Sequence, residues 1–334
     1  MADSTPPLHR IDEADMARRL LATEGRCVIV SHLRPDGDAV GSSLALWHAL
    51  RDAGRAAICL GVGPVAATYD FLEGLDEIVP AEGFEPAPGD VLVVLDCGEV
   101  SRLRDSVRPL LEKMPVLCID HHGSSHGFGG PICLEPDAGS VSEVLYRILV
   151  AAKLPISKAC AEALWTGIIT DTGRFSYDAT SPDTMRAGAE LLRAGVRSDY
   201  IAECVYTRNE LRRLRLQRRL LDSIDVRAGG RVVLVSLSAE DYAAEGCTGE
   251  DSENFVDIAR SVRGCEIAAF VRQTKPGAAC NLSLRTKPPF DAAALCATWD
   301  GGGHVRASGA TLAMPLADAI AAVAAQLEAA VAEA

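Results

Sequence analysis

Hydrophobic residues in the first half of the chain form short continuous runs instead of alternating with polar residues. Such runs lie within residues 26–32, 56–62, 90–96 and 115–120, and a helical pattern that ends on Gly54 follows the first of them. Continuous runs are typical of parallel strands buried on both faces of a sheet. The first half therefore predicts an α/β fold with a parallel β-sheet flanked by helices.

The pattern becomes helical after residue 140 and changes again near residue 208. Residues 208–221 place leucines at helical spacing among arginines, which predicts an amphipathic connecting helix with solvated or ion-paired arginines. A second α/β pattern begins near Arg231 and ends in an alanine-rich helix. We therefore predict two lobes, with an α/β domain at 1–195, a helical linker at 196–228 and a smaller α/β domain at 229–334.

The composition limits what the chain binds and where it works. The formal net charge is −13 over 334 residues, which argues against duplex DNA binding because that requires a basic surface. The eleven cysteines form no CxxC pair, so we expect buried reduced thiols. The first twenty residues lack the basic and apolar stretches of a signal peptide, and no apolar run reaches membrane-spanning length. We expect a cytoplasmic protein that does not bind membranes.

Aspartate and histidine residues follow the predicted strands. They are His32, Asp36 and Asp38 after the first strand, Asp96 after the third, Asp120, His121 and His122 after the fourth, and Asp171 in a helical segment. The carboxyl ends of strands in an α/β sheet meet at one crevice, where crowded carboxylates repel each other unless cations neutralise them. Mixed carboxylate and imidazole ligands suit manganese, and also iron, cobalt or zinc. Two ions that share an Asp form the site of many phosphatases and nucleases.

Each feature taken singly also has a simpler explanation. A histidine at a strand end is often only hydrogen-bonded, the Asp36 and Asp38 pair could be a turn, and Asp171 could cap a helix. The GGGH element at 301–304 is either a tight turn or a backbone surface that a phosphate can approach. Arg285 is either a surface arginine or a phosphate ligand. The joint occurrence of the Asp and His residues at strand ends favours a metal site.

Four successive motifs resemble those of the DHH phosphoesterase superfamily: HLRPDGDAVGS, VLDCG, IDHHGSS and GIITDTGRFSY. A later motif, GGGHVRASGA at 301–310, resembles the signature of the accompanying DHHA1 domain. The order is most similar to that of NrnA-type members, which act as nano-RNases on very short oligonucleotides and as phosphatases on 3'-phosphoadenosine 5'-phosphate. The resemblance implies a DHH catalytic domain, a DHHA1 substrate-binding domain and two divalent metal ions. Mn²⁺ is the ion that we expect.

The resemblance also implies roles for individual residues. His32 and Asp36 would bind one manganese ion, Asp38, His121 and Asp171 would bind the other, and Asp96 would bridge them. Asp120 would orient a ligand and His122 would face the substrate phosphate, which makes these two the catalytic candidates. The expected substrate-binding residues of the C-terminal domain are Arg285, Gly302, Gly303, His304 and Arg306.

The expected function is metal-dependent hydrolysis of phosphate esters in small nucleotides. This would degrade very short oligoribonucleotides in the 3'-5' direction, dephosphorylate 3'-phosphoadenosine 5'-phosphate to AMP, or do both. The alternatives are a cyclic di-AMP phosphodiesterase and a nucleotide sensor without catalysis. The expected partners are short oligonucleotides or small phosphorylated nucleotides, and both a monomer and a homodimer are compatible with the sequence.

Overall fold

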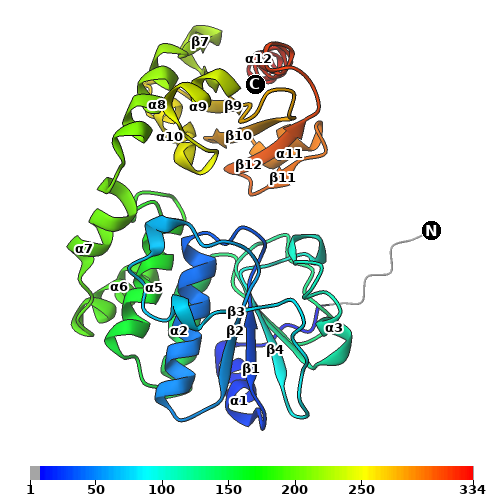
Figure 1. Ribbon diagram of the computed structural model, residues 1–334, viewed down its shortest axis with the longest axis vertical. Coiled ribbons are helices and arrows are strands. Elements are labelled where there is room, and N and C mark those ends of the chain that lie inside the picture. Colours follow the sequence, from blue (N-terminus) through cyan, green and yellow to red (C-terminus); the bar gives the residue numbers. More distant parts are fainter. Residues whose placement is uncertain (1–7, 334) are drawn as a thin grey trace. The chain divides into compact units, whose positions relative to one another are not determined.

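The computed structural model describes residues 8–333. The chain divides into two compact units, one that extends to Arg208 and one that begins at Asn209. This boundary lies inside the segment 196–228. Each unit has its own sheet and its own hydrophobic core, so each is described by itself (Figure 1).

A six-stranded parallel sheet forms the centre of the first unit. Its spatial order is β3-β2-β1-β4-β5-β6, and all neighbouring strands pair in parallel. The strands are β1 (Cys27–Val30), β2 (Ala57–Gly61), β3 (Val79–Pro80), β4 (Val91–Leu95), β5 (Val116–Asp120) and β6 (Ile132–Leu134). The predicted parallel sheet is thereby confirmed. The strand order reverses direction between β1 and β4, which is where ligands bind in open α/β sheets.

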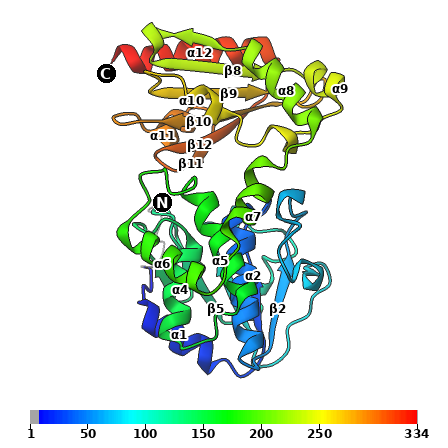
Figure 2. The same ribbon diagram turned by 90° about the vertical axis from the view of Figure 1, so that its left-hand side faces the viewer.

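Both faces of this sheet are covered, and alternate residues of β1 show how. Cys27 and Ile29 point into a core formed with helices, whereas Val28 and Val30 point into the core of the opposite face. The helices of the first face are α1 (Glu13–Ala22), α2 (Gly37–Asp52), α4 (Val141–Ala151), α5 (Lys158–Asp171) and α6 (Pro182–Arg193), seen in front of the sheet in Figure 2. The short helix α3 (Leu110–Lys113) and neighbouring loops cover the other face. Burial on both faces explains the continuous apolar runs.

Polar side chains fix where these helices begin. Asp36 caps α2, Ser140 caps α4, and Ser157 caps α5, each by accepting hydrogen bonds from amides of the first turn. The unit ends with α7 (Ser198–Ala202) and a single π-helical turn, η4 (Glu203–Thr207). These caps define where α2, α4 and α5 begin beside the sheet.

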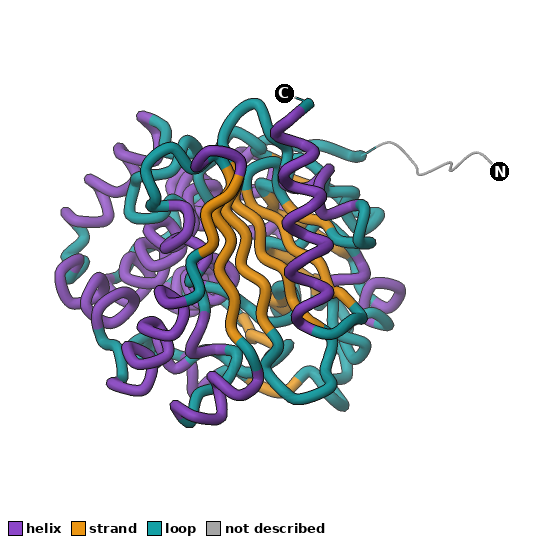
Figure 3. The backbone as a smooth tube through the Cα atoms, turned by 90° about the horizontal axis from the view of Figure 1, so that it is seen from above, coloured by secondary structure: helices purple, strands orange, loops and turns teal. Residues whose placement is uncertain are grey.

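The second unit contains a mixed six-stranded sheet of order β11-β12-β10-β9-β8-β7. Its strands are β7 (Asp225–Arg227), β8 (Val232–Leu237), β9 (Ile267–Arg272), β10 (Cys280–Thr286), β11 (Gly302–Gly303) and β12 (Ala307–Leu312). Only the β8 and β9 pair is parallel among the paired strands of the described residues. One face is covered by α11 (Ala292–Ala297) and α12 (Leu316–Ala332), and α12 crosses the strands in Figure 3. The predicted second α/β fold is confirmed.

The other face of this sheet carries α8 (Leu211–Asp222), α9 (Ala239–Glu245) and α10 (Val256–Arg260). Helix α8 is amphipathic, as predicted: Leu216 and Leu220 are fully buried. Two of its arginines form ion pairs, Arg212 with Asp251 at 3.2 Å and Arg219 with Glu245 at 2.6 Å. These two arginines of the helix are therefore engaged by acids of the same unit.

Two further features of the described residues bear on the predictions. All eleven cysteines are free thiols, and all but Cys247 are buried. This confirms the expected buried reduced thiols. Within residues 8–333, no helix combines the length and the apolar character that are needed to cross a membrane.

Candidate metal centre

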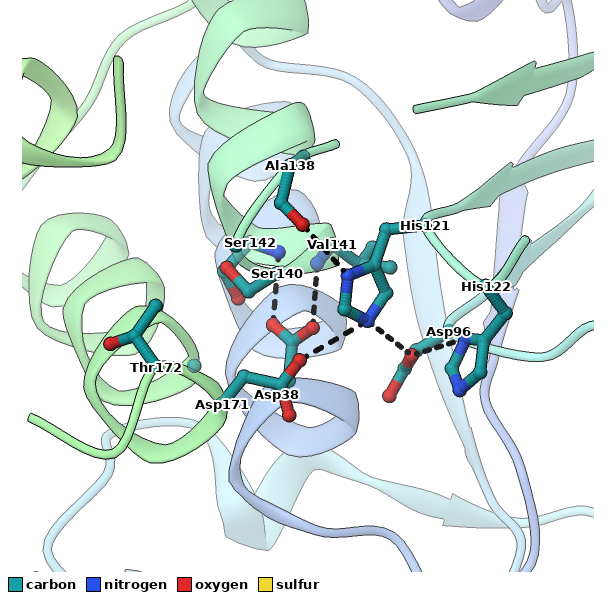
Figure 4. A network of polar contacts seen from close by, with 12 residues as sticks. Asp38, Asp96, His121, His122, Ala138, Ser140, Val141, Ser142, Asp171 and Thr172 are labelled. Atoms are coloured by element: carbon teal, nitrogen blue, oxygen red, sulfur yellow. Dashed lines mark hydrogen bonds and ion pairs between the residues drawn. The ribbon is translucent and has the colours of Figure 1, made fainter. Parts of the chain in front are cut away.

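The eight Asp and His residues that follow the predicted strands meet at the carboxyl edge of the first sheet. His32 follows β1, Asp96 follows β4, and Asp120 ends β5 immediately before His121 and His122. Asp36 and Asp38 lie at the start of α2, and Asp171 is the last residue of α5. Because β1, β4 and β5 are consecutive neighbours in the sheet, residues up to 90 positions apart, His32 and His122, reach one site, and the end of α5 brings Asp171 to it. Figure 4 shows Asp38, Asp96, His121, His122 and Asp171.

Two groups of three potential ligand atoms stand out in this site. One consists of His32, Asp36 and Asp96, the other of Asp38, His121 and Asp171, and in each group the atoms lie within 4.8 Å of one another. A third group consists of Asp96, His121 and His122. It shares Asp96 with the first group and His121 with the second. No residue of the expected ligand set lies outside these groups.

Asp96 faces both groups with different oxygens. Its Oδ2 lies 3.4 Å from Nε2 of His32, and its Oδ1 lies 3.9 Å from Nε2 of His121. The backbone φ of Asp96 is +53°, in the left-handed region that Asp adopts more readily than most residues. Such strained conformations concentrate at functional sites. Asp96 therefore lies between the two groups.

The two histidines of these groups are oriented by backbone carbonyls. Nδ1 of His32 lies 2.8 Å from the carbonyl oxygen of Leu33, and Nδ1 of His121 lies 3.1 Å from that of Ala138. A hydrogen bond donated by Nδ1 leaves Nε2 as the ring nitrogen that can bind a metal ion. Nε2 of His121 lies 3.1 Å from Asp171. Both rings therefore present their ligand nitrogens to the carboxylates.

Asp38 is held by the amino end of a helix. Its carboxylate is buried and accepts hydrogen bonds from the amides of Val141, at 2.6 Å, and Ser142, at 2.9 Å (Figure 4). These are the first two residues of α4, where free amides and the helix dipole favour an anion. The orientation of Asp38 is thus fixed by backbone donors.

Asp120 is fully buried and organises the turn that follows β5. Its Oδ1 accepts hydrogen bonds from the amide of His121, at 2.8 Å, and from Nδ1 of His122, at 2.7 Å. The same ring nitrogen of His122 lies 3.4 Å from Asp96. Asp120 is therefore placed to orient His122 rather than to complete either of the two groups.

The electrostatics of the cluster fit divalent cations. Burial raises the pKa of Asp38 well above its usual value, and the charges of Asp96 and Asp171 raise it further. Burial lowers the pKa of His32, but Asp36 and Asp96 outweigh burial and raise this pKa to about 10. Nε2 of His32 and Oδ1 of Asp96 are buried and make no hydrogen bond of acceptable geometry. Buried polar atoms are normally satisfied, and metal ions would satisfy these.

Sequence reasoning missed three glycines that bring α2 and α5 together. A Cβ atom on Gly41 would lie 2.5 Å from the carbonyl oxygen of Ala163, and one on Gly37 would lie 2.4 Å from Oγ1 of Thr170. A Cβ atom on Gly167 would lie 2.5 Å from Oδ1 of Asp38. These contacts are closer than any side chain allows. Their signal in the sequence is the position of the glycines inside the motifs PDGDAVGS and WTGIITD.

The predicted substrate-binding residues of the second unit gather at one end of its sheet. Arg285, near the end of β10, pairs with Ala307, and Gly303 pairs with Ser308 across the β11 and β12 hairpin. His304 and Arg306 lie in the connecting turn. Nη1 of Arg306 donates to the carbonyl of Phe290, and Nη1 of Arg285 to the carbonyl of Leu284.

The glycines of the GGGH element are not equivalent. Gly303 has a φ of +146°, and its Cβ atom would lie 2.7 Å from the carbonyl oxygen of Ala307, so the hairpin itself requires glycine. A Cβ atom on Gly301 would lie 2.4 Å from the carbonyl oxygen of Gly309. A Cβ atom on Gly302 would meet nothing within 4 Å. The tight-turn explanation therefore accounts for Gly301 and Gly303 but not for Gly302.

The family model described as the DHH family, N-terminal domain, matches residues 26–168. The bifunctional oligoribonuclease and PAP phosphatase NrnA of Thermus thermophilus is 34% identical over 298 residues, which cover 89% of this chain and 87% of that protein. The protein of the same name from Bacillus subtilis is 27% identical and covers 88% of this chain and 91% of its own length.

Solved structures agree with these sequence relatives. An exopolyphosphatase-related protein from Bacteroides fragilis has a TM-score of 0.85 and 28% identity, with 95% of both chains covered. The Mn²⁺ complex of RecJ from Thermus thermophilus has a TM-score of 0.51 and 15% identity, and the match covers 99% of this chain and 57% of that protein. This similarity concerns the fold alone. From the matched family model and the relative with 34% identity, we conclude that the chain belongs to the DHH family.

Proposed function

We propose that this protein is a metal-dependent phosphoesterase that hydrolyses phosphate esters of small nucleotides. The observation that carries the proposal is the position of Asp96, which belongs to one ligand group and whose Oδ1 lies 3.9 Å from Nε2 of His121 in the other. Two relatives that span most of the chain are named as oligoribonucleases and PAP phosphatases. The proposed substrates are therefore very short oligoribonucleotides, degraded from the 3' end, and 3'-phosphoadenosine 5'-phosphate.

The proposed ligand assignment follows the two groups. We assign His32 and Asp36 to one ion, Asp38, His121 and Asp171 to the other, and Asp96 to both. When bound, two divalent ions would supply positive charge to the phosphate and lower the pKa of a water molecule. We propose Mn²⁺ as the ion, because the donor set mixes carboxylates with imidazoles and contains no thiolate.

The chain's own residues would position the reacting groups. Nδ1 of His122 donates to Asp120, so the ring is held at the edge of the cluster with its Nε2 turned away from that carboxylate. The buried carboxylate of Asp38, anchored by two helix amides, keeps one ligand group rigid. We assign substrate recognition to the second unit, through Arg285, Gly302, Gly303, His304 and Arg306. Positioning and electrostatic stabilisation together supply most of the rate enhancement in phosphoryl transfer.

The variant Asp96→Asn tests the shared carboxylate. Asn keeps the size of the side chain and tolerates a positive φ, whereas Ala would add backbone strain. Asp105→Asn is the matched control, because the side chain of Asp105 is 91% exposed. We expect Asp96→Asn to lower kcat by at least about 100-fold, with the unfolding midpoint of the metal-free protein little changed. Normal turnover by Asp96→Asn at saturating Mn²⁺ would rule out the bridging assignment.

A panel of substrates tests the activity itself. The wild-type protein is assayed with Mn²⁺ and separately with Mg²⁺ on a 5'-phosphorylated diribonucleotide, 3'-phosphoadenosine 5'-phosphate and cyclic di-AMP, and kcat/KM values are compared. We expect the first two substrates to be hydrolysed with the higher kcat/KM values. A preference for cyclic di-AMP would favour the alternative phosphodiesterase function, and binding without turnover of any substrate would favour a sensor.

We further propose that the protein works in the cytoplasm. Its free cysteines fit a reducing compartment. The proposed partners are short single strands and nucleotides rather than duplex DNA, in keeping with the net charge of −13. Measuring the molar mass in solution would decide between a monomer and a homodimer.

A further inference from the structure

Arg102 lies next to the candidate metal centre but is not part of either ligand group. It ends the 3-10 turn η3 (Val100–Arg102), which follows Asp96 along the chain, and it is partly buried. Its Nη1 lies 3.3 Å from Nε2 of His122. Its carbonyl oxygen accepts a hydrogen bond of 2.8 Å from the amide of Leu33, the residue after His32. Arg102 therefore joins the loop after β1 to the turn after β5.

The guanidinium of Arg102 differs from those of its neighbours in the chain. Arg104 forms an ion pair with Glu82, and Arg108 forms one with Asp105. Arg102 has no carboxylate oxygen within 4.0 Å among residues 8–333. A guanidinium offers five N–H donors in a planar fork that suits carboxylate and phosphate groups. A partly buried arginine without such a partner, beside a predicted phosphoesterase site, indicates an anion-binding position.

The contact between Arg102 and His122 indicates which of these two residues can donate a hydrogen bond to an anion. Arginine has no acceptor atom, so Nε2 of His122 must accept the hydrogen bond from Arg102. The ring proton then lies on Nδ1, where it is donated to Asp120 at 2.7 Å. In this arrangement Nε2 of His122 offers a lone pair and no proton to an approaching phosphate oxygen. The donor at that point is Arg102.

The charges of the cluster also favour a cation here. Four carboxylates, those of Asp36, Asp38, Asp96 and Asp171, balance the charge of two divalent ions. Asp120 adds a further negative charge, and the substrate phosphate brings more. A fixed positive charge at the edge of the site offsets this excess and stabilises charge that develops on phosphoryl oxygens.

We propose that Arg102 is a phosphate-binding residue of this centre. It donates to a non-bridging oxygen of the scissile phosphate and gives up its hydrogen bond with Nε2 of His122 when the phosphate enters. The proposal rests on the proposed function, since it assigns a residue to the phosphate of that reaction. It is an additional site residue, because the motifs that predicted the ligands did not point to it.

The test compares Arg102→Ala and Arg102→Lys with the wild type and with Arg186→Ala. Arg186 is a matched control because its side chain is 75% exposed and pairs with Asp183 on α6 of the same unit, so its loss removes the same charge. The first readout is orthophosphate binding to the Mn²⁺-loaded protein by calorimetry. The second is kcat and KM for 3'-phosphoadenosine 5'-phosphate and for a diribonucleotide. Mn²⁺ stoichiometry and the thermal midpoint are measured for each variant.

We expect Arg102→Ala to bind orthophosphate at least about ten-fold more weakly and to lose about 100-fold to 1,000-fold in kcat/KM. Arg102→Lys should fall between Ala and wild type, since lysine keeps the charge without the fork. Guanidinium chloride at millimolar concentration should partly restore the Ala variant and leave Arg186→Ala unchanged. Mn²⁺ stoichiometry should not change.

Three results would overturn the proposal. One is orthophosphate binding and turnover by Arg102→Ala that match Arg186→Ala. Another is loss of Mn²⁺ from Arg102→Ala, because the arginine would then support the ligands instead of the phosphate. The third is a Mn²⁺-loaded wild type that binds no orthophosphate. If the wild type binds orthophosphate through Arg102 but hydrolyses neither nucleotide, the proposed function fails while the assignment of Arg102 holds.

Discussion

A methyl group added at Gly167 would collide with a proposed metal ligand. The Cβ atom of an alanine would lie 2.0 Å from Oγ of Ser142 and 2.5 Å from Oδ1 of Asp38. The serine hydroxyl can rotate away, but the carboxylate is held by two amide hydrogen bonds of 2.6 and 2.9 Å. Gly167→Ala should therefore displace Asp38 or push α5 away from α2.

The expected size of this effect follows from opposing contributions. Replacing glycine by alanine inside a helix stabilises it by about 1 kcal/mol. Overpacking a buried contact costs about 1–3 kcal/mol, and weakening a hydrogen bond to a charged group costs about 1.5–3 kcal/mol more. We expect a net destabilisation of about 1.5–5 kcal/mol and a loss of Mn²⁺ affinity of about 10-fold to 100-fold, as for other residues that orient ligands.

Gly188→Ala provides the control for this experiment. Gly188 also lies inside a helix, α6, but its Cβ atom would first meet Trp165 at 3.4 Å, an ordinary contact. Urea unfolding of the metal-free proteins gives the stability change, and calorimetric titration with Mn²⁺ gives the affinity. If Gly167→Ala matched Gly188→Ala in both measurements, the close helix contact would have no part in setting the ligand position.

Three further predictions concern other parts of the molecule. In Asp90→Asn, the loss of the hydrogen bonds from Arg26 and Ala87 should cost about 1–3 kcal/mol of unfolding free energy at pH 7. Burial raises the pKa of Asp90, but the hydrogen bonds from Arg26 outweigh burial and lower this pKa below its usual value. The loss of stability in the variant should therefore shrink as the pH falls below about 4. A loss of unfolding free energy that persisted at pH 2 in urea unfolding would contradict this. Gly302→Ala should leave the thermal midpoint unchanged, because the added Cβ atom has no other atom within 4 Å. The variant should raise KM if the substrate phosphate approaches this backbone, and an unchanged KM would remove Gly302 from the substrate site. Treatment with a chelator should abolish turnover but leave the far-ultraviolet circular dichroism spectrum unchanged, and added Mn²⁺ should restore activity; unfolding on chelation would mean that metal holds the ligand groups together.

The sequence predicted that these Asp and His residues lie together because parallel strands bring their carboxyl ends to one edge. His32 and Asp96 each directly follow a buried apolar run, and that placement needs no knowledge of side-chain packing. The predicted helices and the second α/β unit follow from the same periodicity of apolar residues. The division of labour between the ligand groups came from the family resemblance and stays a proposal.

Other features depend on distances between residues far apart in the chain. The contact of Gly167 with Asp38 joins positions 129 residues apart, and periodicity carries no information on such a contact. The position of Arg102 is set by a short 3-10 turn and by a backbone hydrogen bond to Leu33. Such turns leave no distinctive hydrophobic pattern. The fold was therefore more predictable than the residues that surround the ligands.

The anchoring of Asp38 by helix α4 has a consequence for how the protein acquires its activity. Two amides already hold this carboxylate, so the fold supplies its orientation before any ion arrives. Under the proposed function, metal loading is then a step separate from folding. The active fraction of the protein would follow the free concentration of the proposed metal ion by mass action, without new synthesis or degradation of the protein.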